Sequence, residues 1–178
     1  MPETISARNV LGLTPPYALA RDRSAVSTAA QAVQKAASEV VERAERTRTF
    51  GRKADAISQI WALANECAAP DWNGEGALPI AQRAVFEAAA FVRALPHGIP
   101  LPEFAPEPDG SISLDWIGSR SRIFSVSVGA SERLAYAWLD GTDRGHAVAR
   151  FDGEIVPARI LEGIKGLVQG ANAAIGPR

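Results

Sequence analysis

The segment from Asp71 to Ala77 has the clearest potential for chemistry in this sequence. It reads Asp-Trp-Asn-Gly-Glu-Gly-Ala, so two carboxylates stand beside two glycines that can adopt positive φ. In one interpretation, Asp71 and Glu75 bind a cation or the amine of a ligand. In the other, which we favour, the segment is a turn between two helices that the indole of Trp72 anchors. The candidate binding residues of this loop are Asp71, Trp72, Asn73 and Glu75.

The two histidines are the only imidazole bases available to a catalytic site. His97 lies in Pro-His-Gly, which is typical of an exposed turn. His146 follows Asp140 and Asp143 closely enough for the three side chains to gather around a metal ion, although a solvated hairpin turn accounts for the same residues. The sequence contains neither a Gly-x-Ser-x-Gly nucleophile motif nor a phosphate-binding loop. We expect no catalytic residue, metal or cofactor, and an enzyme would need the loop carboxylates and His146 to converge in one pocket.

The balance of charge argues against a dedicated nucleic-acid-binding protein. The chain has 19 basic and 20 acidic residues and a formal net charge of −1, whereas a duplex-binding protein carries a marked basic excess on one face. Arginines gather at Arg120 and Arg122 and again over residues 43–53, where glutamates interleave them. A nucleic-acid accessory is therefore the third hypothesis, behind a protein-interaction module and an enzyme.

The single cysteine, Cys67, excludes a disulfide within the chain and a cysteine-rich zinc site. It lies in an apolar helical stretch, so we expect a buried and inert thiol. No apolar run approaches the ~18 residues that a membrane span needs. Residues Met1 to Thr4 lack the basic-then-apolar layout of a secretion signal. We expect a cytoplasmic protein without membrane contact.

The elements that position these residues begin with a long helix. Residues 1–23 contain several prolines and no sustained periodicity, which predicts a flexible arm. Over residues 24–50, small residues recur at alternating spacings of four and three, as in a heptad seam. The seam consists of Val26, Ala30, Val33, Ala37, Val40, Ala44 and Thr47. This helix either lies on its own domain, which we favour, or mediates self-association, and Gly51 is predicted to cap it.

A pair of shorter helices is predicted over residues 53–95. The first runs to about Cys67 and has an apolar stripe of Ile57, Ile60, Trp61 and Ala64. The second begins near Pro79, a residue well suited to a first helical turn, and ends before Pro96.

Beyond residue 102 the apolar period changes from that of a helix to that of a strand. Bulky apolar residues alternate with Ser or Asp over 112–116 and 124–128 and with Ala over 134–138, and turns separate the runs. The segment 103–106 is predicted to pair before them, and 146–151 is a candidate fifth, edge strand. Connections this short require antiparallel neighbours.

The predicted fold is therefore α+β. N-terminal helices precede an antiparallel four-strand meander, or a five-strand one if 146–151 pairs, within a single domain over residues 24–171. A closing helix over 157–171 is predicted to bury Ile160 and Ile164, and residues 172–178 form a tail.

The two faces of this sheet differ in the size of their side chains. One carries bulky apolar residues and is predicted to be core: Ile112, Leu114, Trp116, Phe124, Val126, Val128, Leu134, Tyr136 and Trp138. The other carries the candidate interaction residues Ser111, Ser113, Asp115, Ser125, Ser127, Ala135 and Ala137. A solvated sheet face usually carries long charged side chains. Small residues instead permit close approach, either by the Ala-rich helix of the same chain or by another molecule.

Motifs over residues 57–168 resemble those of a family of small bacterial α+β proteins. The family combines a Trp-[Asp/Asn]-Gly-x-Gly-Ala loop, a helix ending in Leu-Pro, a Pro-x-Gly-x-Ile-x-Leu-x-Trp strand, a Leu-x-Tyr strand and a Gly-His pair. In this sequence they are Trp72–Ala77, Leu95–Pro96, Pro108–Trp116, Leu134–Tyr136 and Gly145–His146. Asn73 replaces the aspartate usual in the loop, which removes an acidic role there. The resemblance implies a shared domain and brings no activity with it.

The leading hypothesis is a non-enzymatic protein-interaction module, of the kind formed by an accessory protein, an inhibitor or an antitoxin. Its partner would be another protein chain, or a second copy bound through the first helix. The small-residue sheet face, the Ala/Val helix and the arm would provide the contacts.

Overall fold

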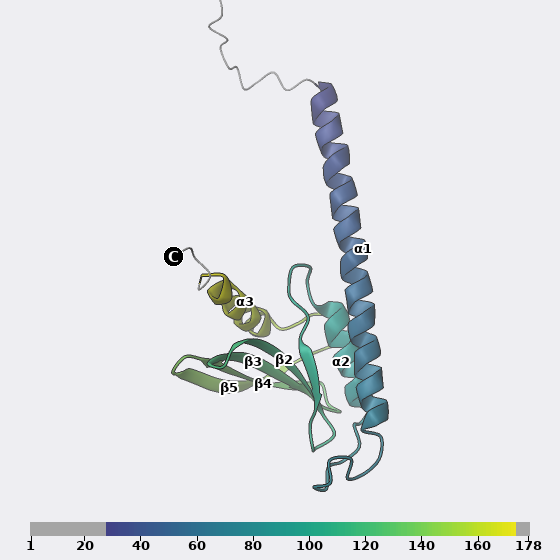
Figure 1. Cartoon of the computed structure of the whole chain (residues 1–178), viewed down its shortest axis with the longest axis vertical. Coiled ribbons are helices and arrows are strands. Elements are labelled where there is room, and N and C mark those ends of the chain that lie inside the picture. Colours follow the sequence, from purple (N-terminus) through teal and green to yellow (C-terminus); the bar gives the residue numbers. More distant parts are fainter. Residues whose placement is uncertain (1–27, 174–178) are drawn as a thin grey trace, which may run out of the picture. The chain divides into compact units, whose positions relative to one another are not determined.

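The computed structural model describes residues 28–173 of the chain (Figure 1). Its helices are α1 (Thr28–Glu66), α2 (Gln82–Ala94) and α3 (Ala158–Ala173). Its strands are β1 (Glu103–Pro106), β2 (Ile112–Ser119), β3 (Arg122–Val128), β4 (Arg133–Asp140) and β5 (Asp143–Arg150). The α+β prediction is confirmed, with the closing helix and the fifth strand. The predicted arm, the start of the first predicted helix and residues 174–178 of the tail lie outside the described residues.

Two units share the chain, Met1–Val41 and Glu42–Arg178. The described part of the first unit, residues 28–41, is helical, and two seam residues in it are largely exposed, Val33 at 70% and Val40 at 65%. The second unit contains the rest of α1, the other two helices and the sheet.

The predicted helix end at Gly51 is wrong, because α1 continues through this residue to Glu66. Gly51 does not adopt the positive φ that a glycine C-cap requires. An interior glycine costs a helix about 1 kcal/mol, and the good helix formers that follow it, Arg52 to Ala54, offset that cost. The two helices predicted on either side of Gly51 are therefore one.

The predicted start of the next helix near Pro79 is also wrong, since α2 begins at Gln82. Backbone N–H groups just before the helix are used elsewhere: Leu78 donates to the carbonyl of Pro108 at 2.8 Å, and Ala81 donates to that of Gly110 at 2.9 Å. Gly110 has φ of +87°, and a Cβ there would lie 2.7 Å from the carbonyl oxygen of Pro79. The 78–81 segment is thus held extended against the β1–β2 hairpin.

The sheet has the strand order β1-β2-β3-β4-β5, with every neighbouring pair antiparallel. Strand β5 starts at Asp143, three residues before the predicted start at His146. The reason is a tight turn, with Gly141 at φ +65°, that joins β5 directly to β4. Asp143, Arg144 and Gly145, which we expected in a hairpin loop, are therefore strand residues.

The bulky face of the sheet forms the core, as predicted. Helix α2 contacts β2 and β3, and α3 contacts β2, β3 and β4 (Figure 1). Phe91 of α2 is fully buried and lies 5.6 Å from Phe151 between ring centroids, and Ile160 and Ile164 of α3 are also fully buried. The second half of α1 packs on α2 through Ile60, which is fully buried, and the predicted inward residue Trp61 is 38% exposed.

Lys53 ties α1 to the C-terminal end of α2. Its Nζ donates to the carbonyl oxygens of Arg93 at 2.8 Å and Leu95 at 2.5 Å. These are carbonyls left without partners at a helix end. Burial lowers the pKa of Lys53.

Candidate functional site

The sheet face opposite the core, which we call the open face, carries the candidate interaction residues on neighbouring strands. Cross-strand pairing aligns Ser113, Ser127 and Ala135 in one row, and Asp115, Ser125 and Ala137 in the next. Ala135 and Ala137 are exposed, and the serines and Asp115 in these rows are half-buried. Within residues 42–173, α2 and α3 pack against the bulky face, so neither helix covers these rows.

Ser111 departs from this arrangement, because it is only 4% exposed. Its hydroxyl donates to a carboxylate oxygen of Glu107, which also accepts from the hydroxyl of Ser127. The backbone N–H of Ser111 donates to Asp109 at 3.0 Å. The Ser111 hydroxyl also lies within hydrogen-bonding distance of the Asp109 carboxylate, at 2.5 Å, and this side-chain bond, together with the backbone one, lowers the pKa of the Asp109 carboxyl. Ser111 is therefore a structural residue of the β1–β2 hairpin, and its predicted place on an accessible face is wrong.

Strands β1 and β5 add residues to the open face that the sequence analysis did not include. The row Ser113–Ser127–Ala135 extends to Ala105 on β1 and to Val148 on β5. The row Asp115–Ser125–Ala137 extends to Glu103 on β1 and His146 on β5. Extending the period-two pattern to both edge strands would have found these residues.

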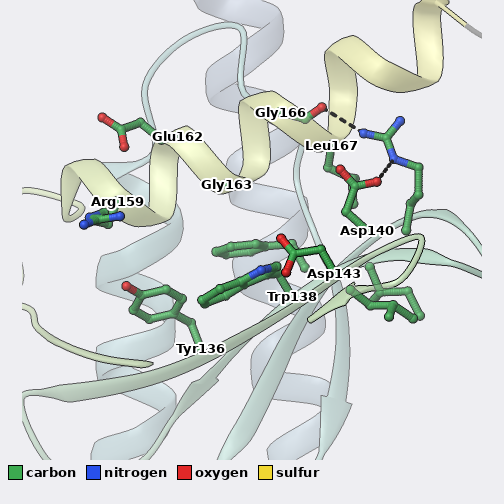
Figure 2. Close-up of a pocket in the computed structure, with 13 residues that line it drawn as sticks. Tyr136, Trp138, Asp140, Asp143, Arg159, Glu162, Gly163, Gly166 and Leu167 are labelled. Carbon is green, nitrogen blue, oxygen red and sulfur yellow. Dashed lines mark hydrogen bonds and ion pairs between the residues drawn. The ribbon is translucent and has the colours of Figure 1, made fainter. Parts of the chain in front are cut away.

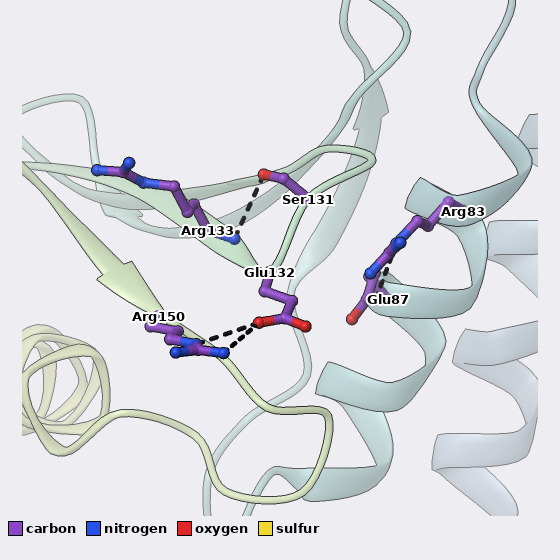
Figure 3. A network of polar contacts seen from close by, with 6 residues as sticks. All are labelled: Arg83, Glu87, Ser131, Glu132, Arg133 and Arg150. Atoms are coloured by element: carbon purple, nitrogen blue, oxygen red, sulfur yellow. Dashed lines mark hydrogen bonds and ion pairs between the residues drawn. The ribbon is translucent and has the colours of Figure 1, made fainter.

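The open face carries opposite charges at its two edges. Carboxylates lie on the β1–β2 side, and the residues that supply them are Glu103, Glu107 and Asp115. Basic side chains lie on the β4–β5 side, and the residues that supply them are Arg133, Arg144, His146 and Arg150. One of the arginines is neutralised locally, since Arg150 contacts Glu132 at 2.7 Å (Figure 3). The centre of the face is uncharged.

The Asp71–Ala77 loop is closed by its own hydrogen bonds. The Asp71 carboxylate accepts from the N–H of Gly76 at 2.6 Å, and the Asn73 side chain accepts from those of Glu75 and Ala77. The Trp72 indole donates to the carbonyl of Leu78 at 2.9 Å. Asp71, Trp72 and Asn73 therefore stabilise the loop itself, which agrees with the interpretation of this segment as a structural turn. The fourth candidate, Glu75, is exposed.

The three candidate metal ligands Asp140, Asp143 and His146 lie on different faces of the sheet. His146 is on the open face opposite Ala137, whereas Asp140 and Asp143 alternate to the core side of the sheet. Within residues 28–173, no group of three or more histidine, cysteine or acidic side chains could hold a metal ion. Cys67 is buried, as expected, and burial raises the pKa of its thiol.

A groove of about 290 Å³ lies on the bulky face, between α3 and the β4–β5 edge (Figure 2). Its floor is formed by Tyr136 and Trp138, which we predicted to be core and which are only half-buried. Their rings are stacked, with centroids 6.2 Å apart and an interplanar angle of 29°, and Phe124 continues the stack.

Two glycines make room for these aromatic rings. A Cβ on Gly163 of α3 would lie 2.1 Å from the Phe124 ring, and a Cβ on Gly145 of β5 would lie 2.3 Å from the Trp138 ring. By its intrinsic propensity alone, a glycine at position 163 weakens a helix. In the structure, a glycine is required at position 163 because the Phe124 ring occupies the space that a side chain would need.

One end of the groove is closed by a polar bridge. Arg122 donates to the Asp140 carboxylate at 2.8 Å and to the carbonyl of Gly166 at 3.1 Å, so it joins β3, β4 and α3 (Figure 2). Asp143, Arg159 and Glu162 also line the groove. Within residues 28–173, these three side chains make no hydrogen bond or ion pair with one another or with their neighbours.

Comparisons with protein-family models, with curated proteins and with solved structures each returned no match. Among the described residues, no helix has the length and apolar character that crossing a membrane requires.

Proposed function

We propose that this protein is a non-enzymatic interaction module that binds another protein chain through the open face of its sheet. One observation carries the proposal. The side chains at the centre of the open face are small, and α2 and α3 leave them uncovered. They belong to Ser125, Ser127, Ala135 and Ala137. Their short side chains lose little conformational entropy when a partner orders them.

The size of the open face suits such a contact. The five strands contain 4, 8, 7, 8 and 8 residues, and at ~3.4 Å per residue and ~4.8 Å between strands they give an area of roughly 570 Å². This approaches the ~800 Å² that each partner contributes to a standard interface. Exposed Val148 on β5, at 55%, and Ile117 on β2, at 56%, add apolar contact. The acidic and basic edges would orient a partner with the opposite arrangement of charge.

Self-association through the first helix is the second candidate. The observation that favours it is the exposure of the seam residues Val33 and Val40, at 70% and 65%. Because the seam is made of Ala and Val, each contact buries little area, and the pairing would be weak at ~25 cal/mol per Å².

A photo-crosslinking amino acid placed at Ala137 in the full-length chain, expressed in its native cell, tests the proposal. The expected result is a discrete crosslinked species that is absent when the same amino acid replaces exposed Ile155, which lies outside the sheet. Crosslinking of equal yield at both positions, or at neither, would overturn the proposal. A homodimeric product obtained instead with the amino acid at Val40 would favour self-association.

A further inference from the structure

The groove beneath α3 has the chemistry of a ligand site separate from the open face. Its floor is aromatic, and Asp143 lies at the end nearest Trp138 (Figure 2). The pairing of Trp138 with Gly145 makes Asp143, two residues before Gly145 on the same face, a diagonal cross-strand neighbour of Trp138. A carboxylate therefore stands beside an accessible indole.

The charge at this end of the groove is negative. Asp140 is neutralised by Arg122, and Arg122 is also engaged by the carbonyl of Gly166. Asp143 has no such partner within residues 28–173. The remaining basic lining residue, Arg159, lies in the first turn of α3, seven residues before Gly166. At 1.5 Å per residue this separation is about 10 Å along the helix, so Arg159 faces the Tyr136 end instead.

An aromatic floor beside an unpaired carboxylate favours a positively charged organic group. The negative faces of indole and phenol rings attract cations, most strongly where water is partly excluded. A cavity of about 290 Å³ is at the small end of ligand sites, so it fits one alkylammonium or guanidinium group better than a drug-sized molecule.

We propose that the groove between α3 and the β4–β5 edge binds an organic cation over the Tyr136 and Trp138 rings, with Asp143 as its counter-ion. Glu162 and Arg159, three residues apart on the α3 side of the groove, carry opposite charges that offset each other, so Asp143 is the carboxylate that carries the proposal. The cation belongs either to a free amine or to a lysine or arginine side chain of another protein, because both present the same charged group.

Glycine at position 145 is part of this site. It allows the Trp138 ring to lie across β5, since a Cβ there would overlap the ring at 2.3 Å. The Trp138 ring can therefore occupy the groove floor, where it offers a surface to a cation.

The test uses the full-length chain labelled with ¹⁵N. The Nε1–H signal of Trp138, identified by its loss in Trp138→Phe, is followed during titration with agmatine, with tetramethylammonium chloride and with N-acetyl-arginine amide. We expect a saturable shift of this signal and at least a roughly fivefold rise in Kd in Asp143→Asn, in line with a cation held by both a ring and a charge. Glu103→Gln, which removes a carboxylate from the open face, is the matched control and should leave Kd within about twofold.

The probes also separate the two sources of the cation. Tighter binding of agmatine and tetramethylammonium indicates a free amine, whereas tighter binding of the capped arginine indicates a protein side chain. The proposal is overturned if no cation produces a saturable shift, if Asp143→Asn leaves Kd unchanged, or if benzoate binds more tightly than the cations in an Arg159-dependent way. None of these results bears on crosslinking at Ala137, because the groove and the open face lie on opposite sides of the sheet.

Discussion

The two faces of one sheet in this protein show two ways in which a strand sequence is constrained. On the bulky face, Phe124 is 3% exposed and leaves no room for a Cβ on Gly163. On the open face, Ser125, the next residue in the same strand, is half-buried and pairs with exposed Ala137. On the bulky face, the residue type is constrained because its side chain must fill a defined volume in the core. On the open face, the residue type is constrained to a small side chain. A small residue therefore has a different meaning on each face: on the bulky side it makes room for a ring, and on the open side it permits close approach.

The largest expected difference between the faces is the cost of truncating a side chain. Phe124→Ala removes a bulky-face ring that is buried and contacts Trp116 and Tyr136, and we expect the free energy of unfolding to fall by about 3–5 kcal/mol. Val148→Ala, an apolar truncation on the open face, should cost less than about 1 kcal/mol. Urea unfolding monitored by circular dichroism measures both values. Similar losses in the two variants would mean that the faces do not differ in packing.

Two glycines of α3 differ in their surroundings, because only Gly163 lies against a buried ring. Gly163→Val drives a side chain into the buried Phe124 ring and should cost about 2–3 kcal/mol. Gly166→Val is the matched control, because a Cβ on Gly166 would meet nothing within 4 Å, and it should be close to neutral since valine has the better helix propensity. A Gly163→Val variant as stable as the control would show that the contact with Phe124 does not constrain this position.

These glycines also mark what the sequence could and could not predict. The alternation of Ile112, Leu114 and Trp116 with small polar residues is enough to predict a strand and its buried face, and the structure confirms it. The continuity of α1 through Gly51 was missed because a local stop signal was outweighed by strong helix formers on its far side. The late start of α2 was missed because its cause is tertiary, the pairing of 78–81 with the β1–β2 hairpin.

The candidate sites divide in the same way. The central residues of the open face follow from a period of two, so all of them except Ser111 could be placed from the sequence. The groove could not be predicted from the sequence, because it depends on how far α3 extends over the sheet. The single available signal was a glycine in each element facing an aromatic residue, Gly145 opposite Trp138 and Gly163 against Phe124. Which glycine faces which ring is a property of the packed structure.

In the β1–β2 hairpin, the contribution of Asp109 to stability should depend on pH. Hydrogen bonds from Ser111 lower the pKa of Asp109 below 3.8, so the folded state binds a proton there less tightly than the unfolded state does. The contribution of Asp109 to the free energy of unfolding is therefore fully present above the unfolded-state pKa. It is lost as pH falls through the folded-state pKa. Asp109→Asn should lower the free energy of unfolding by about 0.5 kcal/mol near neutral pH, because solvent screens an exposed group.

The difference between Asp109→Asn and the parent protein should then shrink as pH falls through the folded-state pKa of Asp109, because the parent carboxyl becomes protonated as well. Paired urea titrations at neutral and acidic pH measure it. Asp55→Asn on α1 serves as the control for removal of an exposed carboxylate. A constant difference at both pH values would mean that the Ser111 bonds do not favour the charged form.

The smallest expected effect on stability is on the open face itself. Ala135→Arg adds a long charged side chain at an exposed strand position between Ser127 and Val148, and we expect the free energy of unfolding to change by less than about 0.5 kcal/mol. The same change should abolish crosslinking from Ala137, because the added side chain prevents close approach of a partner's backbone. Ile155→Arg, at a residue 73% exposed outside the sheet, should leave both properties unchanged. If Ala135→Arg destabilised the fold by several kcal/mol, the open face would be packed against part of the same chain, and its difference from the bulky face would disappear.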